Sequence, residues 1–391
     1  MDIHQRSLEL HQQWRGKTEV AGRIPLNTVE DFSVAYTPGV AEPCKEIHKD
    51  RDKVYIYTRK WNTVAIVTDG TAVLGLGDIG PEAALPVMEG KAIIFKKFGN
   101  VDAIPICLAT KDTDEIIRTI KNLVPAFGGI NLEDISAPRC FEIERRLKQE
   151  IDIPVFHDDQ HGTAIVILAA LINSLKLVNK KIQEISIVIN GAGAAALATA
   201  RLLLEAGVQD LILCDTKGAI YEGRDGLNPE KAIIAGMTNK NRRQGLLQDI
   251  IKGRDVFIGV SVGGIVDTDM IRTMNNDAIV FALANPEPEI YPEMAKNGGA
   301  RIVGTGRSDF ANQINNALVF PGLFRGVLDV RAREVNYSMK IATAFALASC
   351  IPDNELREDY VIPEILDPRV IQAVAEAVRE AAKQTNTARI F

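Results

Sequence analysis

The chain has 391 residues, 46% apolar and 25% charged, and this length favours two domains over a single hydrophobic core. Its formal net charge of −6 provides no basic field, which argues against binding to nucleic acid or to an anionic membrane surface. The five cysteines are scattered and form no C-x-x-C pair, as is typical of buried thiols in a reducing compartment rather than of a disulfide framework.

Neither the N-terminus nor the most apolar run of the chain favours a membrane protein. Residues 1–14 are polar, and the most apolar run, residues 163–175, is shorter than a membrane span. We therefore expect a cytoplasmic protein whose partner is a small molecule.

The first part of the chain predicts a smaller α/β domain that follows a helical N-terminal segment. Up to about residue 60, helical patterns lie on both sides of a turn at Tyr36-Thr37-Pro38-Gly39. Short apolar runs then alternate with helix-length stretches. These patterns predict strands at 64–67, 103–108 and 153–156, helices at 113–124 and 138–149, and a long apolar helix at 163–178.

The second part of the chain predicts a series of strands from longer and more continuous apolar runs. They are expected at 185–189, 211–214, 255–260, 278–282 and 301–303. Continuous apolar runs separated by helices indicate parallel strands covered on both faces, so we expect a Rossmann-type doubly wound parallel sheet. We place the boundary near residue 162, which gives domains 1–162 and 163–391, the second ending in an amphipathic helix at 370–383.

Two segments match the glycine pattern G-x-G-x-x-G, and their surroundings separate them. The segment from Gly75 to Gly80 is followed by Pro81, and no strand that ends in an acid lies at the right distance, so we interpret it as a glycine loop lining a cleft. The segment that begins at Gly191 follows a strand and opens a helix, and the next strand ends in Asp215. The alternative for this segment is a turn with small residues for packing.

A nicotinamide dinucleotide is therefore expected on the second glycine segment. The predicted contacts are Gly191, Gly193, Ala194, Ala195 and, at the ribose hydroxyls, Asp215. A carboxylate there favours NAD over NADP because it repels a 2′-phosphate, unless Lys217 or Arg224 offsets its charge.

Two acidic pairs follow apolar runs in the first domain: Glu133-Asp134 follows Ile130-Asn131-Leu132, and Asp158-Asp159 follows the strand at 153–156. Ligands of open α/β sheets bind beyond the carboxyl ends of strands, and clustered carboxylates suit Mg²⁺ or Mn²⁺. Each pair also has a plainer explanation, since Asp158-Asp159 could cap a helix that begins near Gly162 and Glu133-Asp134 could be a solvated turn.

Two histidines flank the second acidic pair. Imidazole would favour a softer metal, but a histidine beside a strand end is more often hydrogen-bonded scaffold. We expect the scaffold role for His157 and His161.

Motifs spread over nearly the whole chain resemble those of the malic enzymes, in the order that the family has them, and the length resembles the short prokaryotic form. The matching segments are Tyr36-Thr37-Pro38-Gly39-Val40, Thr68-Asp69-Gly70, Gly75-Leu76-Gly77, Glu89-Gly90-Lys91, Leu132-Glu133-Asp134, His157-Asp158-Asp159-Gln160-His161-Gly162-Thr163, Phe281-Ala282-Leu283-Ala284-Asn285-Pro286, Asn315-Asn316 and Phe320-Pro321-Gly322.

The resemblance implies oxidative decarboxylation of L-malate to pyruvate and CO₂ with NAD or NADP and Mg²⁺ or Mn²⁺. It further implies a homodimer or higher homo-oligomer in which the N-terminal segment reaches a neighbour's site. The residues that match functional positions of the family are Glu133, Asp134 and Asp159 as metal ligands, Asp158 as a neighbouring acid of the catalytic group, Lys91 as general base, Tyr36 as general acid, Asn285 for cofactor and substrate, and Asn316 for substrate.

These roles agree with the chemistry of the side chains. A base must remove the C2 hydroxyl proton as hydride leaves, and an acid must protonate C3 after CO₂ departs. Because the ordinary pKa of lysine, about 10.4, is too high for this base, we expect a nearby cation and desolvation to lower it at Lys91.

One position departs from the family. Larger eukaryotic members carry an arginine that clamps a malate carboxylate where this chain has Ala72. The residue that clamps the carboxylate is therefore not identified by the sequence, and we expect Asn285 and Asn316 to take a larger share of the binding. The alternatives are a malolactic enzyme that releases lactate, a hydroxy-acid or amino-acid dehydrogenase without decarboxylation, and a nucleotide sensor without turnover.

Overall fold

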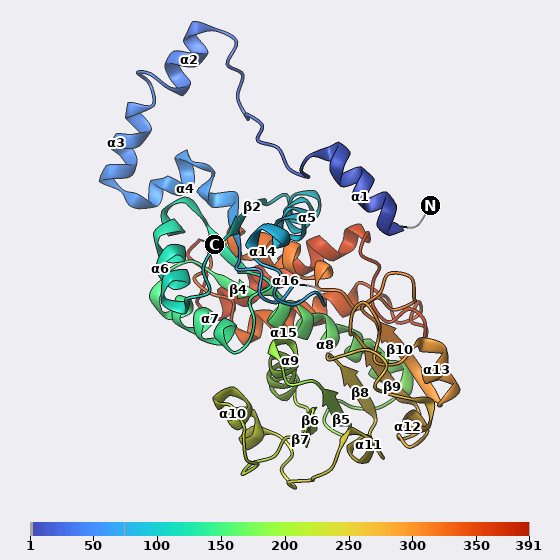
Figure 1. Ribbon diagram of the computed structural model, residues 1–391. Coiled ribbons are helices and arrows are strands. Elements are labelled where there is room, and N and C mark those ends of the chain that lie inside the picture. Colours follow the sequence, from blue (N-terminus) through green and yellow to red (C-terminus); the bar gives the residue numbers. More distant parts are fainter. Residues whose placement is uncertain (1–2, 74, 391) are drawn as a thin grey trace.

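The computed structural model describes residues 3–73 and 75–390. A segment of short helices comes first, and its α2 and α3 stand clear of the rest of the chain (Figure 1). The α-helices of this segment are α1 (Ile3–Trp14), α2 (Val29–Ala35), α3 (Ala41–Lys49) and α4 (Val54–Tyr57), with 3-10 turns η1 (Arg51–Lys53) and η2 (Arg59–Asn62). No residue of α1 to α4 is buried, so these helices contribute nothing to the core of their own chain.

Four parallel strands in the order β2-β1-β3-β4 form the first sheet. They are β1 (Thr63–Thr68), β2 (Asp102–Cys107), β3 (Gly129–Leu132) and β4 (Val155–His157), and every residue of β1, β3 and β4 is buried. The strands are joined by α5 (Pro81–Gly99), α6 (Thr113–Leu123) with η3 (Val124–Ala126), and α7 (Arg139–Glu150). Because the strands are parallel, the loops after β1, β3 and β4 open at the same edge.

The second sheet has the order β10-β9-β8-β5-β6-β7. Its strands are β5 (Ser186–Asn190), β6 (Asp210–Asp215), β7 (Gly218–Ala219), β8 (Val256–Gly259), β9 (Ala278–Ala282) and β10 (Ala300–Thr305). All neighbours are parallel except β6 and β7, which form a short antiparallel pair. The chain reverses its winding direction between β5 and β8, which is where doubly wound sheets bind ligands.

The connections of the second sheet are helical, which confirms the predicted fold class of an α/β protein with a Rossmann-type sheet. They are α9 (Ala194–Glu205), α10 (Pro229–Met237), α11 (Leu247–Ile250), α12 (Thr268–Arg272) and α13 (Pro292–Asn297). All five cysteines are free; Cys140, Cys214 and Cys350 are buried, whereas Cys107 is half-buried and Cys44 is exposed.

The long helix α8 (Asp158–Val178) runs between the two sheets and begins five residues earlier than the predicted start at Thr163. β4 pairs with β3 only as far as His157, and this residue is also the N-cap of α8. Asp158 and Asp159 therefore lie in the first helical turn and not in a loop before it, and the predicted boundary at residue 162 falls inside a continuous helix. Although α8 is long and apolar enough to cross a membrane, 72% of its apolar window is buried inside the chain, as in a core helix.

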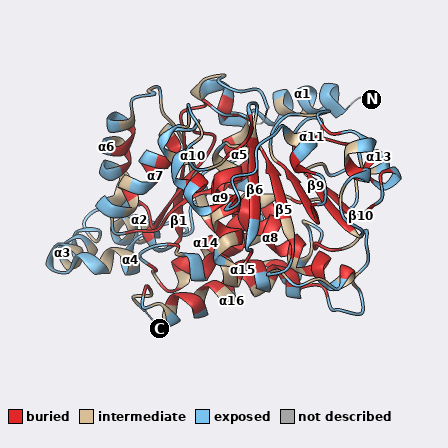
Figure 2. Ribbon diagram, turned by 90° about the horizontal axis from the view of Figure 1, so that it is seen from below, coloured by how far each residue is buried: buried red, intermediate tan, exposed pale blue. Residues whose placement is uncertain are grey.

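Three C-terminal helices cover both halves of the molecule. They are α14 (Phe320–Asp329), which follows η4 (Asn316–Leu318), α15 (Tyr337–Ser349) and α16 (Pro368–Gln384). The Phe320 and Phe324 rings of α14 have their centroids 4.6 and 5.3 Å from that of Phe95 on α5, so α14 packs on the first half, while α15 packs on α8. Figure 2 shows α8, α9 and the strands of the second sheet as the buried interior, with α3 largely exposed.

Candidate active site

Three predicted metal ligands meet at the carboxyl edge of the first sheet. Glu133 and Asp134 follow β3, and Asp159 lies in the first turn of α8 directly after β4, which is the neighbour of β3. One carboxylate oxygen from each of these three residues lies within 4.8 Å of the others. The Asp134 backbone N–H donates to Asp159 Oδ2 at 2.8 Å, which fixes the two strand ends relative to each other. The arrangement has the oxygen ligands that a hard divalent cation prefers.

Lys91 points into this acid cluster from the middle of α5. Its Nζ lies 2.5 Å from Glu133 Oε1 and 2.5 Å from Asp158 Oδ2, and its side chain is 8% exposed. The ammonium also lies 4.5 Å from the centroid of the Phe320 ring. The structure therefore brings together Lys91, Asp158 and the three predicted metal ligands, which are more than 40 residues away from Lys91 in sequence.

The pKa values of the acids in the cluster are raised, which indicates that the cluster has too little positive charge to balance its carboxylates. Burial and the Asp159 carboxylate raise the pKa of Glu133 well above its usual range and raise that of Asp134 to about 8. Burial raises the pKa of Asp158 to about 6, against the opposing effect of Lys91. In addition, Asp134 Oδ2 and Asp158 Oδ1 are buried and accept no hydrogen bond from the described residues. Buried carboxylates that repel one another and lack donors fit a divalent cation.

Lys91 itself does not behave as the sequence suggested. Burial alone lowers the pKa of Lys91, but the Asp158 and Glu133 carboxylates outweigh that effect, so the pKa lies above its ordinary value. The protein's own groups thus hold Lys91 protonated, and the expected lowering is not provided by the residues around it.

Asn131 and Gly162 help to position the acids of the cluster. Asn131 Nδ2 donates to Glu133 Oε2 at 2.9 Å. A Cβ added to Gly162 would lie 1.9 Å from Asp158 Oδ1 and 3.1 Å from the Cβ of Asn316. Gly162 is therefore the residue that lets Asp158 and the predicted substrate residue Asn316 approach this turn of α8.

The predicted dinucleotide turn lies at the switch point of the second sheet. Gly191 follows β5 with a φ of +120°, and an added Cβ would lie 2.7 Å from the carbonyl oxygen of Val260 after β8. Gly193 is the N-cap of α9, whose first residues are Ala194 and Ala195, and an added Cβ on Gly193 would meet nothing within 4 Å. A bare helix N-terminus beside open space has the N–H donors and the dipole that a pyrophosphate would need.

Comparisons with known proteins agree with this division of the chain into two parts. The family model described as "Malic enzyme, N-terminal domain" matches residues 15–148, and the one described as "Malic enzyme, NAD binding domain" matches residues 160–383. The chain belongs to the malic enzyme family.

Individual relatives cover the chain almost completely. A bifunctional malic/malolactic enzyme of Bacillus subtilis is 58% identical over 391 residues, which are 100% of this chain and 95% of the relative. An NAD-dependent malic enzyme of Geobacillus stearothermophilus is 57% identical over 96% of this chain and 78% of its own length, and other relatives are named NADP-dependent malic enzymes. The crystal structure of a malic enzyme from Pyrococcus horikoshii superposes with a TM-score of 0.95 at 48% identity, covering 100% of this chain and 93% of that one. The predicted family, fold and oxidoreductase class are therefore confirmed.

In this malic enzyme fold, Asp215 ends β6 as predicted but is already engaged by cations. Its carboxylate accepts hydrogen bonds from Arg224 at 2.9 and 2.5 Å, from Lys231 at 2.8 Å and from the backbone N–H of Lys217 at 3.0 Å. Burial would raise the pKa of Asp215, but Arg224 and Lys231 hold it far below its usual range. Because Arg224 neutralises the carboxylate, Asp215 gives no net repulsion of a 2′-phosphate and the argument for NAD loses its weight.

The loop after β9 carries Asn285, which lies where the two halves of the fold face each other. The side chain of Asn285 is exposed, and a Cβ added to Gly75 would lie 2.7 Å from its carbonyl oxygen. The Gly75 loop, of which Leu74 lies outside the described residues, thus packs against the loop that follows β9. That the glycine loop lines a cleft stays a prediction.

Tyr36 is the predicted site residue that the chain does not bring to the cluster. It is the C-cap of α2, is 62% exposed, and has its ring against Phe32 at a centroid distance of 5.7 Å. Since α2 stands clear of the body that holds the acids, Tyr36 and Lys91 are separated within one chain (Figure 1).

Arg139 is a residue near the site that the sequence reasoning missed. It donates to the buried Asp69 Oδ2 at 2.8 Å and to Thr71 Oγ1 at 3.0 Å, in the loop after β1. The Ala72 N–H in the same loop donates to the Asp134 carbonyl at 2.9 Å. The signal that could have found Arg139 is Asp69, since an acid directly after a buried strand needs a donor or a cation.

The two histidines flanking Asp158-Asp159 differ from each other. His161 has the expected scaffold role, because its Nε2 lies 2.8 Å from Glu144 Oε1 and its Nδ1 lies 3.0 Å from Lys340 Nζ. His157 is fully buried, and neither ring nitrogen has a hydrogen-bond partner among the described residues; its Nδ1 lies 3.7 Å from Asp159 Oδ2.

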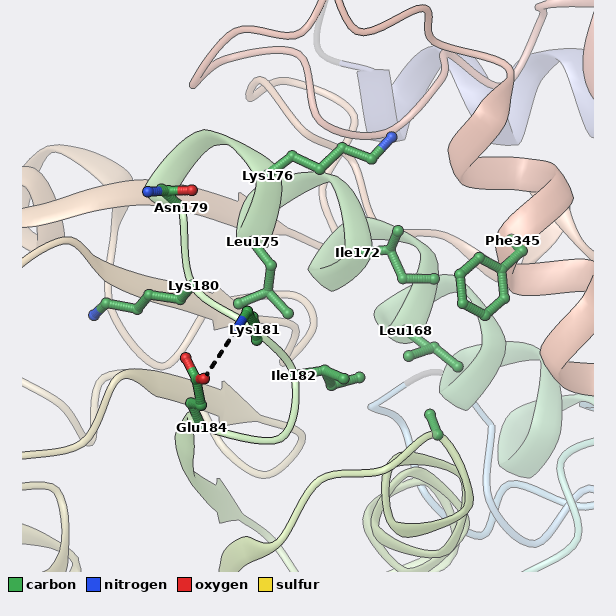
Figure 3. A pocket seen from close by; sticks show the side chains of 11 residues that line it. Leu168, Ile172, Leu175, Lys176, Asn179, Lys180, Lys181, Ile182, Glu184 and Phe345 are labelled. Carbon is green, nitrogen blue, oxygen red and sulfur yellow. Dashed lines mark ion pairs between the residues drawn. The ribbon is translucent and has the colours of Figure 1, made fainter.

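A separate pocket lies at the other end of α8, around Leu168, Ile172 and Phe345 (Figure 3). Its rim carries Lys176, Lys180 and Lys181. Each of these lysines has an acidic partner: Asp353 at 2.8 Å, Asp255 at 2.8 Å and Glu184 at 3.4 Å respectively. The pocket contains none of the predicted site residues, so we do not assign the chemistry to it.

Proposed function

We propose that this chain catalyses oxidative decarboxylation of L-malate to pyruvate and CO₂, with reduction of NAD or NADP. The observation that carries the proposal is the buried cluster in which Lys91 Nζ lies 2.5 Å from both Glu133 and Asp158, beside Asp134 and Asp159. The NAD-binding domain and the names of the relatives support the same reaction.

Glu133, Asp134 and Asp159 are the residues that would hold Mg²⁺ or Mn²⁺. The donor set fits, because all three offer carboxylate oxygens within 4.8 Å of one another and Asp134 Oδ2 lacks a donor among the described residues. A bound divalent cation would polarise the C2 oxygen of malate, stabilise the negative charge that develops as CO₂ leaves, and offset the carboxylates that hold Lys91 protonated.

Lys91 is the proposed general base. Its Nζ takes the proton of the C2 hydroxyl, and a dinucleotide bound at the Gly191 turn would supply the nicotinamide ring as the acceptor of the C2 hydride. Asp158 accepts a hydrogen bond from Lys91 Nζ at 2.5 Å and so fixes the direction of the amine. The bond from C3 to the departing carboxylate then breaks, CO₂ leaves, and the remaining enol takes up a proton at C3 to give pyruvate.

The protein works as a homodimer or higher oligomer in this proposal, and Tyr36 of a second copy supplies the proton for C3. Three observations support a second copy: α1 to α3 bury no residue in their own chain, Val29, Phe32 and Val34 of α2 are exposed, and Tyr36 is far from its own acid cluster. Exposed apolar side chains on a projecting segment are typical of a contact between subunits.

Asn285 and Asn316 are the proposed contacts to the malate carboxylates, since Ala72 cannot act as a clamp. Asn316 lies beside the turn of α8 that carries Asp158, and Asn285 faces the first half across the Gly75 loop. An amide side chain donates to a carboxylate without adding charge, so each asparagine contributes a modest share of the binding.

The proposal is tested by initial rates with L-malate, Mn²⁺ or Mg²⁺, and NAD⁺ or NADP⁺, with pyruvate and reduced dinucleotide both measured. We expect equal amounts of both products with at least one combination, and none after chelation of the metal. Absence of pyruvate with every combination would overturn the proposal.

A malolactic reaction is the second candidate, because the Bacillus subtilis relative is named a bifunctional malic/malolactic enzyme. That reaction would convert malate to lactate and CO₂ with no net change in the oxidation state of a bound dinucleotide. Lactate without net reduced dinucleotide identifies the malolactic reaction, whereas pyruvate with an equal amount of reduced dinucleotide identifies the malic one.

A further inference from the structure

A fully buried carboxylate that the proposed mechanism does not use lies beside the dinucleotide turn. Glu289, in the loop after β9, is 0% exposed. Its Oε1 accepts hydrogen bonds from the Ser261 backbone N–H at 2.8 Å and the Ser261 hydroxyl at 3.2 Å, and its Oε2 accepts one from the Ala284 N–H at 3.0 Å. One side chain therefore joins the loop after β8 to the loop after β9.

The same connection continues to the end of β5. The Ser261 hydroxyl accepts a hydrogen bond from Asn190 Nδ2 at 2.7 Å, and Asn190 directly precedes Gly191. The three strands β5, β8 and β9 are neighbours in the sheet, and their carboxyl ends border the switch point. The chain Asn190, Ser261, Glu289 and Ala284 thus links all three loops of the dinucleotide crevice.

The packing around Glu289 is close. A Cβ added to Gly259, the last residue of β8, would lie 2.4 Å from the carboxyl carbon of Glu289. The next residue after the Ala284 donor is Asn285, whose carbonyl oxygen would lie 2.7 Å from a Cβ on Gly75. Because Ala284 is held by Glu289 on one side and Asn285 meets the Gly75 loop on the other, a shift of the carboxylate moves Asn285.

Glu289 has no lysine or arginine partner among the residues that the structure describes. Burial raises the pKa of Glu289, and its backbone donors oppose that effect. A buried carboxylate without a cation is unfavourable unless hydrogen bonds compensate it, so these loop N–H groups are what holds it in place.

We propose that Glu289 is a positioning residue, which holds the loops after β5, β8 and β9 so that Asn285 and the nicotinamide end of the dinucleotide meet the acid cluster. The inference rests on the proposed function, since it needs malate and dinucleotide to react between these loops. Glu289 touches neither of them and acts through Ala284 and Ser261.

The decisive variant is Glu289→Gln. Its amide NH₂ replaces one acceptor oxygen, so it faces the N–H of Ser261 or of Ala284, and one hydrogen bond to a charged group is lost. We expect kcat/KM for malate to fall about tenfold or more. Binding of ADP-ribose, which lacks nicotinamide, should stay within about twofold of wild type, because the Gly191 N–H is held separately by the Cys214 carbonyl at 2.9 Å.

Glu287→Gln is the matched control, because Glu287 is exposed in the same loop and loses the same charge. We expect it to resemble wild type in both measurements. A Glu289→Gln enzyme with unchanged kcat/KM, or with ADP-ribose binding reduced as strongly as turnover, contradicts the positioning role. Wild-type enzyme without malate turnover contradicts the proposed function instead.

If Glu289→Gln does not fold, Ser261→Ala decides the question, since it removes the hydroxyl between Asn190 and Glu289 and keeps the backbone donor. It should lower kcat/KM about threefold or more with ADP-ribose binding retained. Wild-type kinetics in Ser261→Ala would then contradict the proposal.

Discussion

At the scale of single residues, the acid cluster holds more carboxylates than the positive charge of the protein can keep ionised. Among the described residues, Lys91 is the one cation whose charged atom lies within 2.5 Å of these carboxylates. It is shared by Glu133 and Asp158. Burial and mutual repulsion raise the pKa of Asp134 to about 8 and that of Asp158 to about 6. A site of this kind binds protons or a cation, and the two compete.

The metal-free protein should become less stable as the pH rises from 6 to 8. The folded-state pKa of Asp134, about 8, lies above the ordinary value of 3.8, so between pH 6 and 8 the folded chain still binds a proton that the unfolded chain has already released. The stabilisation is present at low pH and is lost as the pH passes through 8. Thermal unfolding in chelator at both pH values measures the change, and Mn²⁺ should restore stability at pH 8.

Asp134→Asn should make this pH dependence shallower and weaken Mn²⁺ binding at least about tenfold, because it removes both a titrating group and a ligand. Asp114→Asn is the control, since Asp114 lies on α6 with its side chain 74% exposed. Calorimetric titration with Mn²⁺ measures the affinity. Equal Mn²⁺ binding by Asp134→Asn and wild type would remove Asp134 from the metal site.

At the scale of elements, buried strands and long helices could be predicted because their apolar runs are local signals. β5, β6, β8, β9 and β10 agree with the predicted runs apart from their ends, and the turn at Gly191 lies where the strand–turn–helix pattern put it. The antiparallel strand β7 was missed, since two residues carry no periodic pattern.

The start of α8 could not be read in the same way. Asp158, Asp159 and His161 are polar, so the apolar pattern begins only after them, although the helix begins at Asp158. What decides the start is the end of pairing between β4 and β3 at His157, a contact between distant segments. This difference matters for the site, because it puts both aspartates on one helical turn.

Gly162→Ala tests the role of that turn. The new Cβ would lie 1.9 Å from Asp158 Oδ1 and would push the carboxylate away from Lys91. We expect kcat/KM for malate to fall about a hundredfold with the fold retained, since displacement of a catalytic group by about 1 Å has that effect. Gly236→Ala on α10, where an added Cβ meets nothing within 4 Å, should have wild-type rates. Wild-type rates in Gly162→Ala would contradict the prediction that the new Cβ displaces the Asp158 carboxylate from its catalytic position.

At the scale of the whole molecule, the two halves are joined by α8 and the C-terminal helices, while the N-terminal segment has no place in the core of its own chain. The acids and Lys91 could be named from motifs, and their meeting follows from strand order. The position of Tyr36 could not be predicted from one sequence, because nothing in its local pattern says which copy of the chain it approaches.

Mixed oligomers test whether Tyr36 acts on a neighbour. Lys91→Ala and Tyr36→Phe are each expected to form little pyruvate alone. If Tyr36 acts across subunits, a mixed dimer has one site with both native residues, and random mixing after denaturation and refolding should recover about a quarter of wild-type pyruvate formation. No recovery in dimers that are shown to be mixed would place Tyr36 in the site of its own chain or outside the chemistry.

The central claim is that Lys91, in the cluster of Glu133, Asp134, Asp158 and Asp159, is the base for malate oxidation. Its most direct test compares reduced dinucleotide formed from L-malate and Mn²⁺ by wild type, by Lys91→Ala and by Lys96→Ala, whose lysine is 54% exposed on the same helix. We predict wild-type rates for Lys96→Ala and no measurable malate oxidation for a folded Lys91→Ala. Malate oxidation by Lys91→Ala at the wild-type rate would contradict the account.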